Sequence, residues 1–404
     1  MGGGYSPKFD PKTGAKILPY RVISSDDHVA EPDDVFTSRV DKKFRERAIH
    51  LETASDGGKW YFCDGRPIWS LATAGVQAGF KFDPDPKVRA QIAAGAGLTF
   101  DDARPGAYDP DARMKDMEID GIAKEVIYPN VGLVFWQSIV ASDLLTAHCR
   151  AYNDYIGEFC ATHPDKLYGL GTLNLDNVEE AVAELKRCHK MGIVGAMIPS
   201  GAPEAKPYTL PEYNPLWATA QDLGMPLSWH IGSHRTTPEL GAQVVAERAA
   251  GKEPDWLHLY NVWEFSKSIS QVIFSGVFER FPGLQIGCVE AGVSWVIPVL
   301  KHFDTTYQDT IAPRNGPNKF KNAMIPSDFW RRNMFIGYQE DELGIKLRNE
   351  LGVDTIQWGS DYPHTESTFP RSLDVIEENL RDCTATERAK IAGANCARVF
   401  HLDD

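Results

Sequence analysis

Eight short apolar runs recur along the chain, and each is followed by a segment with helical periodicity. Most of the runs are continuously apolar, which is typical of strands buried on both faces of a parallel sheet. They cover residues 20–29, 124–129, 167–173, 192–199, 225–231, 284–290, 333–338 and 355–361. Eight successive strand–helix units predict an α/β fold of the (β/α)₈ TIM-like barrel type, with a doubly wound open sheet as the alternative.

The segments between these runs carry apolar residues at helical spacing. The predicted helices cover residues 142–162, 177–191, 211–223, 263–281, 295–307, 343–351, 372–380 and 386–400. Asn177 and Glu180 fit an N-cap and the acidic residue three positions later, and Gly224 can end the helix before it.

Residues 36–115 do not follow the alternation of strand and helix. This stretch is charged and rich in turn residues, and it contains Trp60 and Trp69. We interpret it as an insertion after the first strand that covers the barrel mouth. The chain 1–404 is therefore expected to form a single barrel domain, with 36–115 as an inserted cap segment.

The charge balance restricts the class of partner. Lys and Arg number 42 against 56 Asp and Glu, which gives a formal net charge of −14. Nucleic acids and anionic membranes require a basic face, so neither is an expected partner. No run of 18 apolar residues and no apolar secretory signal is visible, and the seven cysteines form no CxxC pair. These features predict a cytoplasmic protein that acts on a small molecule.

Polar residues gather where the predicted strands end. The first strand ends in Asp26 and His28, which are two positions apart and so point to the same face. The fifth, sixth and eighth strands end in His230, Glu290 and Asp361. Because catalytic groups of such barrels lie at the carboxyl ends of the strands, these side chains are expected to converge. Mixed nitrogen and oxygen ligands suit Zn²⁺, Mn²⁺ or Fe²⁺.

The motifs around these residues resemble those of the amidohydrolase superfamily, in the branch called amidohydrolase-related or amidohydrolase family 2. They are ISSDDHVAEP at residues 23–32, WHIG at 229–232, FSGVFERFPG at 274–283, CVEAGVSWVIP at 288–298 and WGSDYPH at 358–364. The resemblance implies a distorted barrel with a divalent metal, and it matches Asp26, His28, His230 and Asp361 to the branch's metal-binding positions. Relatives of this branch often form homodimers.

The resemblance implies a metal-dependent hydrolase or a carboxy-lyase, acting on a small organic acid, amide or lactone by hydrolysis or non-oxidative decarboxylation. The chain departs from the decarboxylase pattern at two positions. Glu290 stands where decarboxylases often carry histidine, and His302 stands where relatives commonly carry arginine. Asp361 can serve as a ligand and as a proton acceptor for bound water, while Glu290 or His234 can protonate a leaving group.

Three readings therefore stay open. In the alternative to the hydrolase or lyase, Glu290, His302 and His234 complete a second metal site, and two irons make the chain a dinuclear non-heme iron monooxygenase. A non-catalytic barrel is disfavoured because the ligand set is intact. Asp27 points to the opposite face from Asp26 and is predicted to be a cap or turn residue, and His364 is either a substrate contact or a turn residue.

Overall fold

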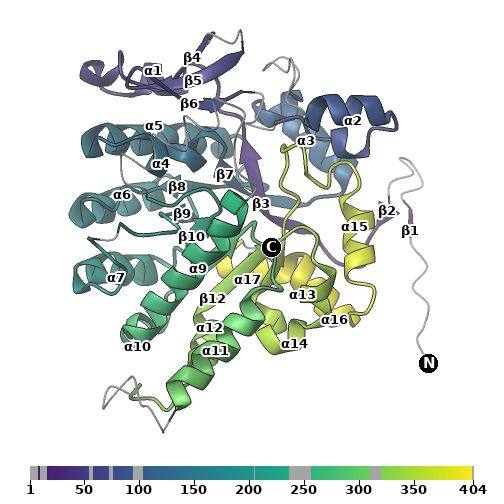
Figure 1. The fold of residues 1–404 in the computed structure, drawn as a ribbon. Helices are drawn as coiled ribbons and strands as arrows, with labels where there is room; N and C mark the ends of the chain where they lie inside the picture. The colour runs from purple at the N-terminus through teal and green to yellow at the C-terminus, as the bar shows by residue number, and fades with distance from the viewer. Residues whose placement is uncertain are drawn as a thin grey trace.

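Eight parallel strands form the centre of the molecule in the computed structural model (Figure 1). The structure describes residues 8–9, 16–53, 58–71, 76–93, 103–203, 205–235, 256–309 and 320–402. The sheet runs from β3 through to β13 in sequence order, so the predicted (β/α)₈ barrel is confirmed and the open doubly wound sheet is wrong. Its strands are β3 (Ile23–Val29), β7 (Lys124–Pro129), β8 (Leu167–Thr172), β9 (Gly195–Met197), β10 (Leu227–His230), β11 (Ile286–Val289), β12 (Met334–Tyr338) and β13 (Ile356–Trp358).

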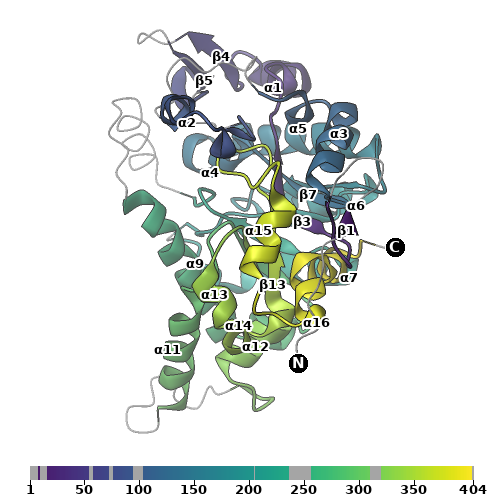
Figure 2. The same cartoon turned by 90° about the vertical axis from the view of Figure 1, so that its right-hand side faces the viewer.

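The barrel closes at a seam between its first and last strands, which Figure 2 shows close together. The Asp361 N–H donates to the Asp26 carbonyl at 2.8 Å, and the His28 N–H donates to the Tyr362 carbonyl at 2.5 Å. A Cβ on Gly359 would lie only 2.6 Å from the Asp26 Cβ. The absence of a side chain at Gly359 therefore lets the two strands approach closely.

Helices surround the strands (Figure 1). Asn177 caps the helix Val178–Lys190 as predicted, because its side-chain oxygen accepts from the N–H groups of Glu179 and Glu180. Gly224 ends the helix Asn214–Leu223 in the left-handed conformation with φ 64°. The helices after β7 are α4 (Phe135–Ser138), α5 (Ser142–Ala161), α6 (Val178–Lys190), α7 (Asn214–Leu223), α9 (Trp256–Phe274), α10 (Val277–Arg280), α11 (Val296–Gln308), α12 (Pro326–Asn333), α13 (Glu342–Lys346), α14 (Arg348–Leu351), α15 (Ser372–Asn379), α16 (Ala385–Ala389) and α17 (Asn395–Phe400).

The inserted segment builds a small antiparallel sheet and several helices of its own. The sheet consists of β4 (His50–Thr53), β5 (Lys59–Cys63) and β6 (Arg66–Ser70), and the helices are α1 (Val35–Arg39), α2 (Pro86–Ala93) and α3 (Pro110–Asp120). Phe369 lies against Gly79, and the hydroxyl of Thr365 donates to Gln77. The insertion thus contacts the loop that follows β13, and its role as a cap stays a prediction.

A short N-terminal hairpin pairs β1 (Lys8–Phe9) with β2 (Lys16–Ile17). All seven cysteines are free thiols with buried side chains. Among the described residues, every helix is too short or too polar to cross a membrane.

Candidate metal centre

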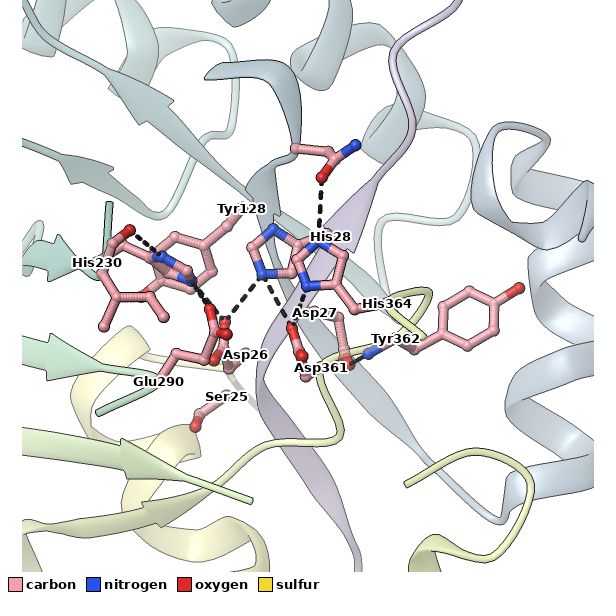
Figure 3. Close-up of polar contacts among 12 residues, drawn as sticks. Ser25, Asp26, Asp27, His28, Tyr128, His230, Glu290, Asp361, Tyr362 and His364 are labelled. Carbon is pink, nitrogen blue, oxygen red and sulfur yellow. Dashed lines mark hydrogen bonds and ion pairs between the residues drawn. The ribbon is translucent and has the colours of Figure 1, made fainter. Parts of the chain in front are cut away.

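Side chains from four places along the barrel converge at its mouth (Figure 3). Asp26 and His28 come from β3, His230 ends β10, Glu290 follows β11, and Asp361 follows β13. The ligand atoms of Asp26, His28, His230 and Glu290 all lie within 4.8 Å of one another, and those of His28, Glu290, Asp361 and His364 form a second group of this kind. The predicted convergence of strand ends is therefore present in the structure.

The imidazole nitrogens of two histidines face the carboxylates directly. His28 Nε2 lies 3.2 Å from Asp361 Oδ1 and 3.5 Å from Asp26 Oδ1. His230 Nε2 lies 3.4 Å from Asp26 Oδ1 and 3.2 Å from Glu290 Oε2. The side chains of His28, His230 and Asp361 have no exposed surface, whereas that of Glu290 is 14% exposed. Glu290 is therefore the carboxylate of the cluster that reaches furthest toward solvent.

Hydrogen bonds behind the two histidines orient their free nitrogens. Nδ1 of His28 lies 2.8 Å from the Pro129 carbonyl, and Nδ1 of His230 lies 3.0 Å from the Ile231 carbonyl. A carbonyl accepts only, so each Nδ1 carries the proton and each Nε2 presents a lone pair to the cluster in the neutral ring. This arrangement is typical of histidines that bind a metal through Nε2.

Four buried atoms in the cluster lack a hydrogen-bond partner: Asp26 Oδ1, His28 Nε2, His230 Nε2 and Asp361 Oδ2. Buried polar atoms are nearly always paired, and three of these unpaired atoms face one another, since Asp26 Oδ1 lies 3.5 Å from His28 Nε2 and 3.4 Å from His230 Nε2. A divalent cation with nitrogen and oxygen ligands would give partners to atoms of this kind. The residues present therefore fit a divalent metal ion.

The protonation of the carboxylates reflects their crowding. Burial alone raises the pKa of Asp26, but the neighbouring imidazoles of His230 and His28 hold it below its usual value. Burial also raises the pKa of Asp361, but His364 and His28 lower it to below its usual value. Burial raises the pKa of Glu290 well above its usual value, and the charges of Asp361 and Asp26 raise it further. Without a cation, Glu290 therefore loses its proton less easily than an ordinary glutamate, because Asp26 and Asp361 are close to it.

Two of these residues have an unusual backbone. Glu290 has φ 64° and Asp361 has φ 61°, both in the left-handed region that residues with a side chain rarely adopt. Such conformations occur mainly at functional sites and persist only where the surrounding structure enforces them. Each lies directly after its strand, where the turn redirects the chain at the barrel mouth.

His364 contacts both Asp361 and His28. Its Nδ1 lies 2.7 Å from Asp361 Oδ1, its Nε2 lies 3.0 Å from Asn130 Oδ1, and its ring stacks on that of His28 at 4.1 Å. Its position in the YPH turn therefore also makes it a contact of Asp361. Sequence reasoning did not find Asn130, since a single asparagine after a strand carries no distinctive pattern.

Glu31 holds the loop that carries Asn130. Its carboxylate accepts from the backbone N–H groups of Asn130, Val131 and Gly132 at 3.1, 2.9 and 3.3 Å. Burial raises the pKa of Glu31 to about 7 although these N–H groups lower it. Glu31 therefore fixes the backbone of the loop that follows β7.

Two predicted site residues do not join the cluster. His302, the candidate ligand of the alternative second metal site, lies exposed on α11 and, among the described residues, belongs to neither group of converging ligand atoms. His234 is buried in the loop after β10, where Nδ1 lies 3.3 Å from Gln137 Nε2, and it also stands outside both groups.

The chain is similar to known proteins of one enzyme family. A family model described as Amidohydrolase matches residues 132–402. A gamma-resorcylate decarboxylase of Rhodococcus jostii (strain RHA1) is 26% identical over 316 residues, which cover 72% of this chain and 88% of that protein. The family match begins after β7, so Asp26 and His28 are assigned by geometry and not by that match.

Two solved structures share the fold. An amidohydrolase from Mycobacterium avium subsp. paratuberculosis K-10 superimposes with a TM-score of 0.75 and 21% identity, covering 95% of this chain and 100% of that one. A dihydroxybenzoic acid decarboxylase from Polaromonas sp. JS666, solved with bound manganese and the inhibitor 2-nitroresorcinol, gives a TM-score of 0.62 and 19% identity, covering 95% and 98%. Because the family model matches well over half of the chain, this protein belongs to the amidohydrolase family of enzymes.

Proposed function

We propose that this protein is a metal-dependent decarboxylase that removes CO₂ from a small aromatic acid without oxidation. The observation that carries the proposal is the convergence of Asp26, His28, His230 and Glu290, whose ligand atoms lie within 4.8 Å of one another, with Asp361 3.2 Å from His28. The relatives named above support the reaction type, since two of them are decarboxylases of phenolic acids. The proposed ion is Mn²⁺, which one of these solved relatives contains.

Asp26, His28, His230 and Asp361 are the residues proposed to hold the ion. When bound, a divalent ion polarises the oxygens of a substrate and so stabilises negative charge that develops during the reaction. The chain contributes the fixed orientation of its ligands. The carbonyls of Pro129 and Ile231 orient the two rings, and His364 orients the carboxylate of Asp361.

We assign the proton transfer to Glu290. Loss of CO₂ breaks a carbon–carbon bond, leaves its electron pair on the substrate carbon and requires one proton for the new C–H bond. Glu290 is the carboxyl group of the cluster with the largest exposed fraction, so it can face a substrate that enters from the mouth. In its protonated form the carboxyl group of Glu290 can donate that proton to the substrate carbon.

The diiron monooxygenase alternative loses the feature that motivated it, because His302 points to solvent on α11. Hydrolysis of an amide or lactone uses the same metal ligands, with Asp361 as the proton acceptor for water. Arg235 does not separate these reactions, because its guanidinium is bonded to the carbonyls of Trp136, Ile139 and Val140 and to Asp176.

The experiment measures metal content and product together. Protein loaded with Mn²⁺ is incubated with 2,6-dihydroxybenzoate and related phenolic acids, and the release of CO₂ is measured. We expect CO₂ to be released, and we expect its release to stop when a chelator removes the ion. His28→Ala and His230→Ala each remove a proposed ligand. We expect each to weaken Mn²⁺ binding by more than roughly 10–100-fold, which is the effect typical of substituting a residue that hydrogen-bonds a metal ligand.

His302→Ala is the matched control, since it removes an imidazole outside the cluster, and it should keep full metal content and full activity. Retention of full metal content by both His28→Ala and His230→Ala would contradict the metal site. Hydrolysis of amides or lactones without CO₂ release from any acid would instead overturn the decarboxylase proposal and leave the metal site intact.

A further inference from the structure

Asp27 lies between two proposed ligands on β3, yet it faces away from them (Figure 3). Asp26 and His28 point into the barrel, whereas Asp27 points to the outer side of the strand and is completely buried. Its Oδ1 accepts a hydrogen bond from the Ser360 hydroxyl at 2.5 Å and another from the Tyr362 N–H at 3.0 Å. A carboxylate of the first strand thus holds the chain that follows the last strand.

The two residues that Asp27 holds flank Asp361 directly. Asp361 has the left-handed backbone described above, which requires neighbours that enforce it. Its own N–H donates to the Asp26 carbonyl, so contacts on both sides of β3 fix this turn. The orientation of the Asp361 carboxylate in the mouth therefore depends on a contact made outside the barrel.

Arg113 completes the outer cluster from α3. Its Nη1 donates to the His28 carbonyl at 2.7 Å, and its Nε donates to Glu125 at 2.5 Å. The guanidinium lies 4.9 Å from the ring centre of Tyr362. The backbone of His28 and the residue after Asp361 are therefore held by one buried group of side chains.

We propose that Asp27 is a positioning residue for the metal centre, which acts by holding Ser360 and Tyr362 so that Asp361 presents its carboxylate to the ion. This inference rests on the proposed function, because it assumes that Asp361 binds a metal. A simple turn or cap residue bonds its own neighbours in sequence. Asp27 instead joins residues more than 330 positions away, across the seam of the barrel.

The first measurement is the affinity for Mn²⁺ in Asp27→Ala and Asp27→Asn. Asp27→Ala removes the acceptor of both hydrogen bonds, and we expect Mn²⁺ affinity to fall by about 10–100-fold, the usual effect of losing a group behind a metal ligand. Asp27→Asn keeps an oxygen acceptor for both donors, so it should restore affinity close to that of the unaltered protein.

The chain offers a closely matched control in Asp120. This buried carboxylate also accepts from a serine hydroxyl at 2.5 Å and from a backbone N–H at 3.0 Å, both of Ser372, but Ser372 flanks no residue of the cluster. Asp120→Ala removes the same kinds of contact and should leave Mn²⁺ affinity unchanged. If Asp120→Ala lowers affinity as much as Asp27→Ala, the effect is a general loss of structure and the inference is wrong.

A double-mutant cycle tests whether Asp27 acts through Asp361. In the Asp361→Asn background, Asp27→Ala should weaken Mn²⁺ binding far less than it does alone, because the ligand that it positions is already changed. The visible absorption spectrum of the Co²⁺-loaded protein gives an independent readout of coordination. We expect the spectrum of Asp27→Ala to approach that of Asp361→Asn, and that of Asp27→Asn to match the unaltered protein.

Additive effects in the cycle, or an unchanged Co²⁺ spectrum in Asp27→Ala, would overturn the inference while leaving the proposed function in place. Failure of the unaltered protein to bind Mn²⁺ or Co²⁺ would overturn the proposed function and this inference with it. If Asp27→Ala does not fold, Ser360→Ala removes one of the two donors and serves in its place, with a smaller expected loss of affinity.

Discussion

The two faces of β3 carry buried charges of very different character. On the inner face, Asp26 and His28 present atoms without hydrogen-bond partners toward a common point. On the outer face, Asp27 accepts a hydrogen bond from Ser360, which follows the last strand, and Arg113 pairs with Glu125. Two outer atoms, Asp27 Oδ2 and Arg113 Nη2, also lack hydrogen bonds, but they belong to groups of opposite charge that attract one another.

This difference shows how to separate a site from a structural cluster in the same strand. Burial and like charges act on both faces, and burial together with the charge of Glu125 raises the pKa of Asp27 well above its usual value. The outer face includes its own permanent cation, Arg113, whereas the inner face has only imidazoles. An inner face that is rich in acceptors and poor in fixed positive charge is therefore the one that needs an ion.

The strongest test of the comparison removes the cation of the outer face. Arg113→Leu leaves Glu125 and Asp27 buried without a counter-charge, and we expect a loss of about 3–5 kcal/mol in the free energy of unfolding. Urea denaturation of metal-free protein measures this loss separately from any change at the inner face. A loss below about 1 kcal/mol, the usual value of an exposed ion pair, would mean that the outer face is not held by its own charges.

Removal of the metal tests how much the inner face contributes to the free energy of unfolding. At Mn²⁺ concentrations about a hundred times the dissociation constant, binding to the folded state adds about 2.7 kcal/mol, and a chelator should abolish this stabilisation. Thermal unfolding with and without chelator measures the difference, and His28→Ala should show almost none. Equal shifts in both proteins would locate the stabilising ion somewhere other than the inner face.

The smallest expected effect comes from the seam that joins the two faces. In Gly359→Ala the new Cβ would lie 2.6 Å from the Asp26 Cβ and 3.0 Å from its backbone nitrogen. We expect a loss of about 1–3 kcal/mol in stability from overpacking, together with weaker Mn²⁺ binding as the seam opens.

Gly157→Ala is the control for this substitution, because Gly157 lies within α5 and a Cβ there meets nothing closer than 3.7 Å. Alanine at that position should be neutral or slightly stabilising, since it favours the helix. Unchanged stability and unchanged metal affinity in Gly359→Ala would show that the seam can widen without disturbing Asp26.

The fold followed closely from the sequence because buried parallel strands leave a strong local pattern. The run at 124–129 matches β7 at both ends, and the other strands lie within their predicted runs. The helix α12 was missed, and the predicted helix over 343–351 is two shorter helices, α13 and α14. Short polar helices are selected by tertiary packing, which local periodicity does not record.

The site was predictable as far as its residues lie at strand ends. Asp26, His28, His230, Glu290 and Asp361 converge because parallel strands bring their carboxyl ends together. His302 was a candidate ligand of the alternative second metal site because it stands where relatives commonly carry arginine, and spacing alone did not show that it lies on the exposed side of its helix. Asp27 was expected to act within its own turn, since its partners across the seam are distant in sequence.

The seam has a consequence for the order in which the protein is made. Asp26 and His28 are translated long before Asp361 and the residues that hold it, because the first and last strands of the barrel lie far apart in the sequence. A growing chain therefore carries the proposed ligands of β3 before those that follow β13. The proposed coordination can be completed only after β13 and the turn that follows it have been made and have closed the ring.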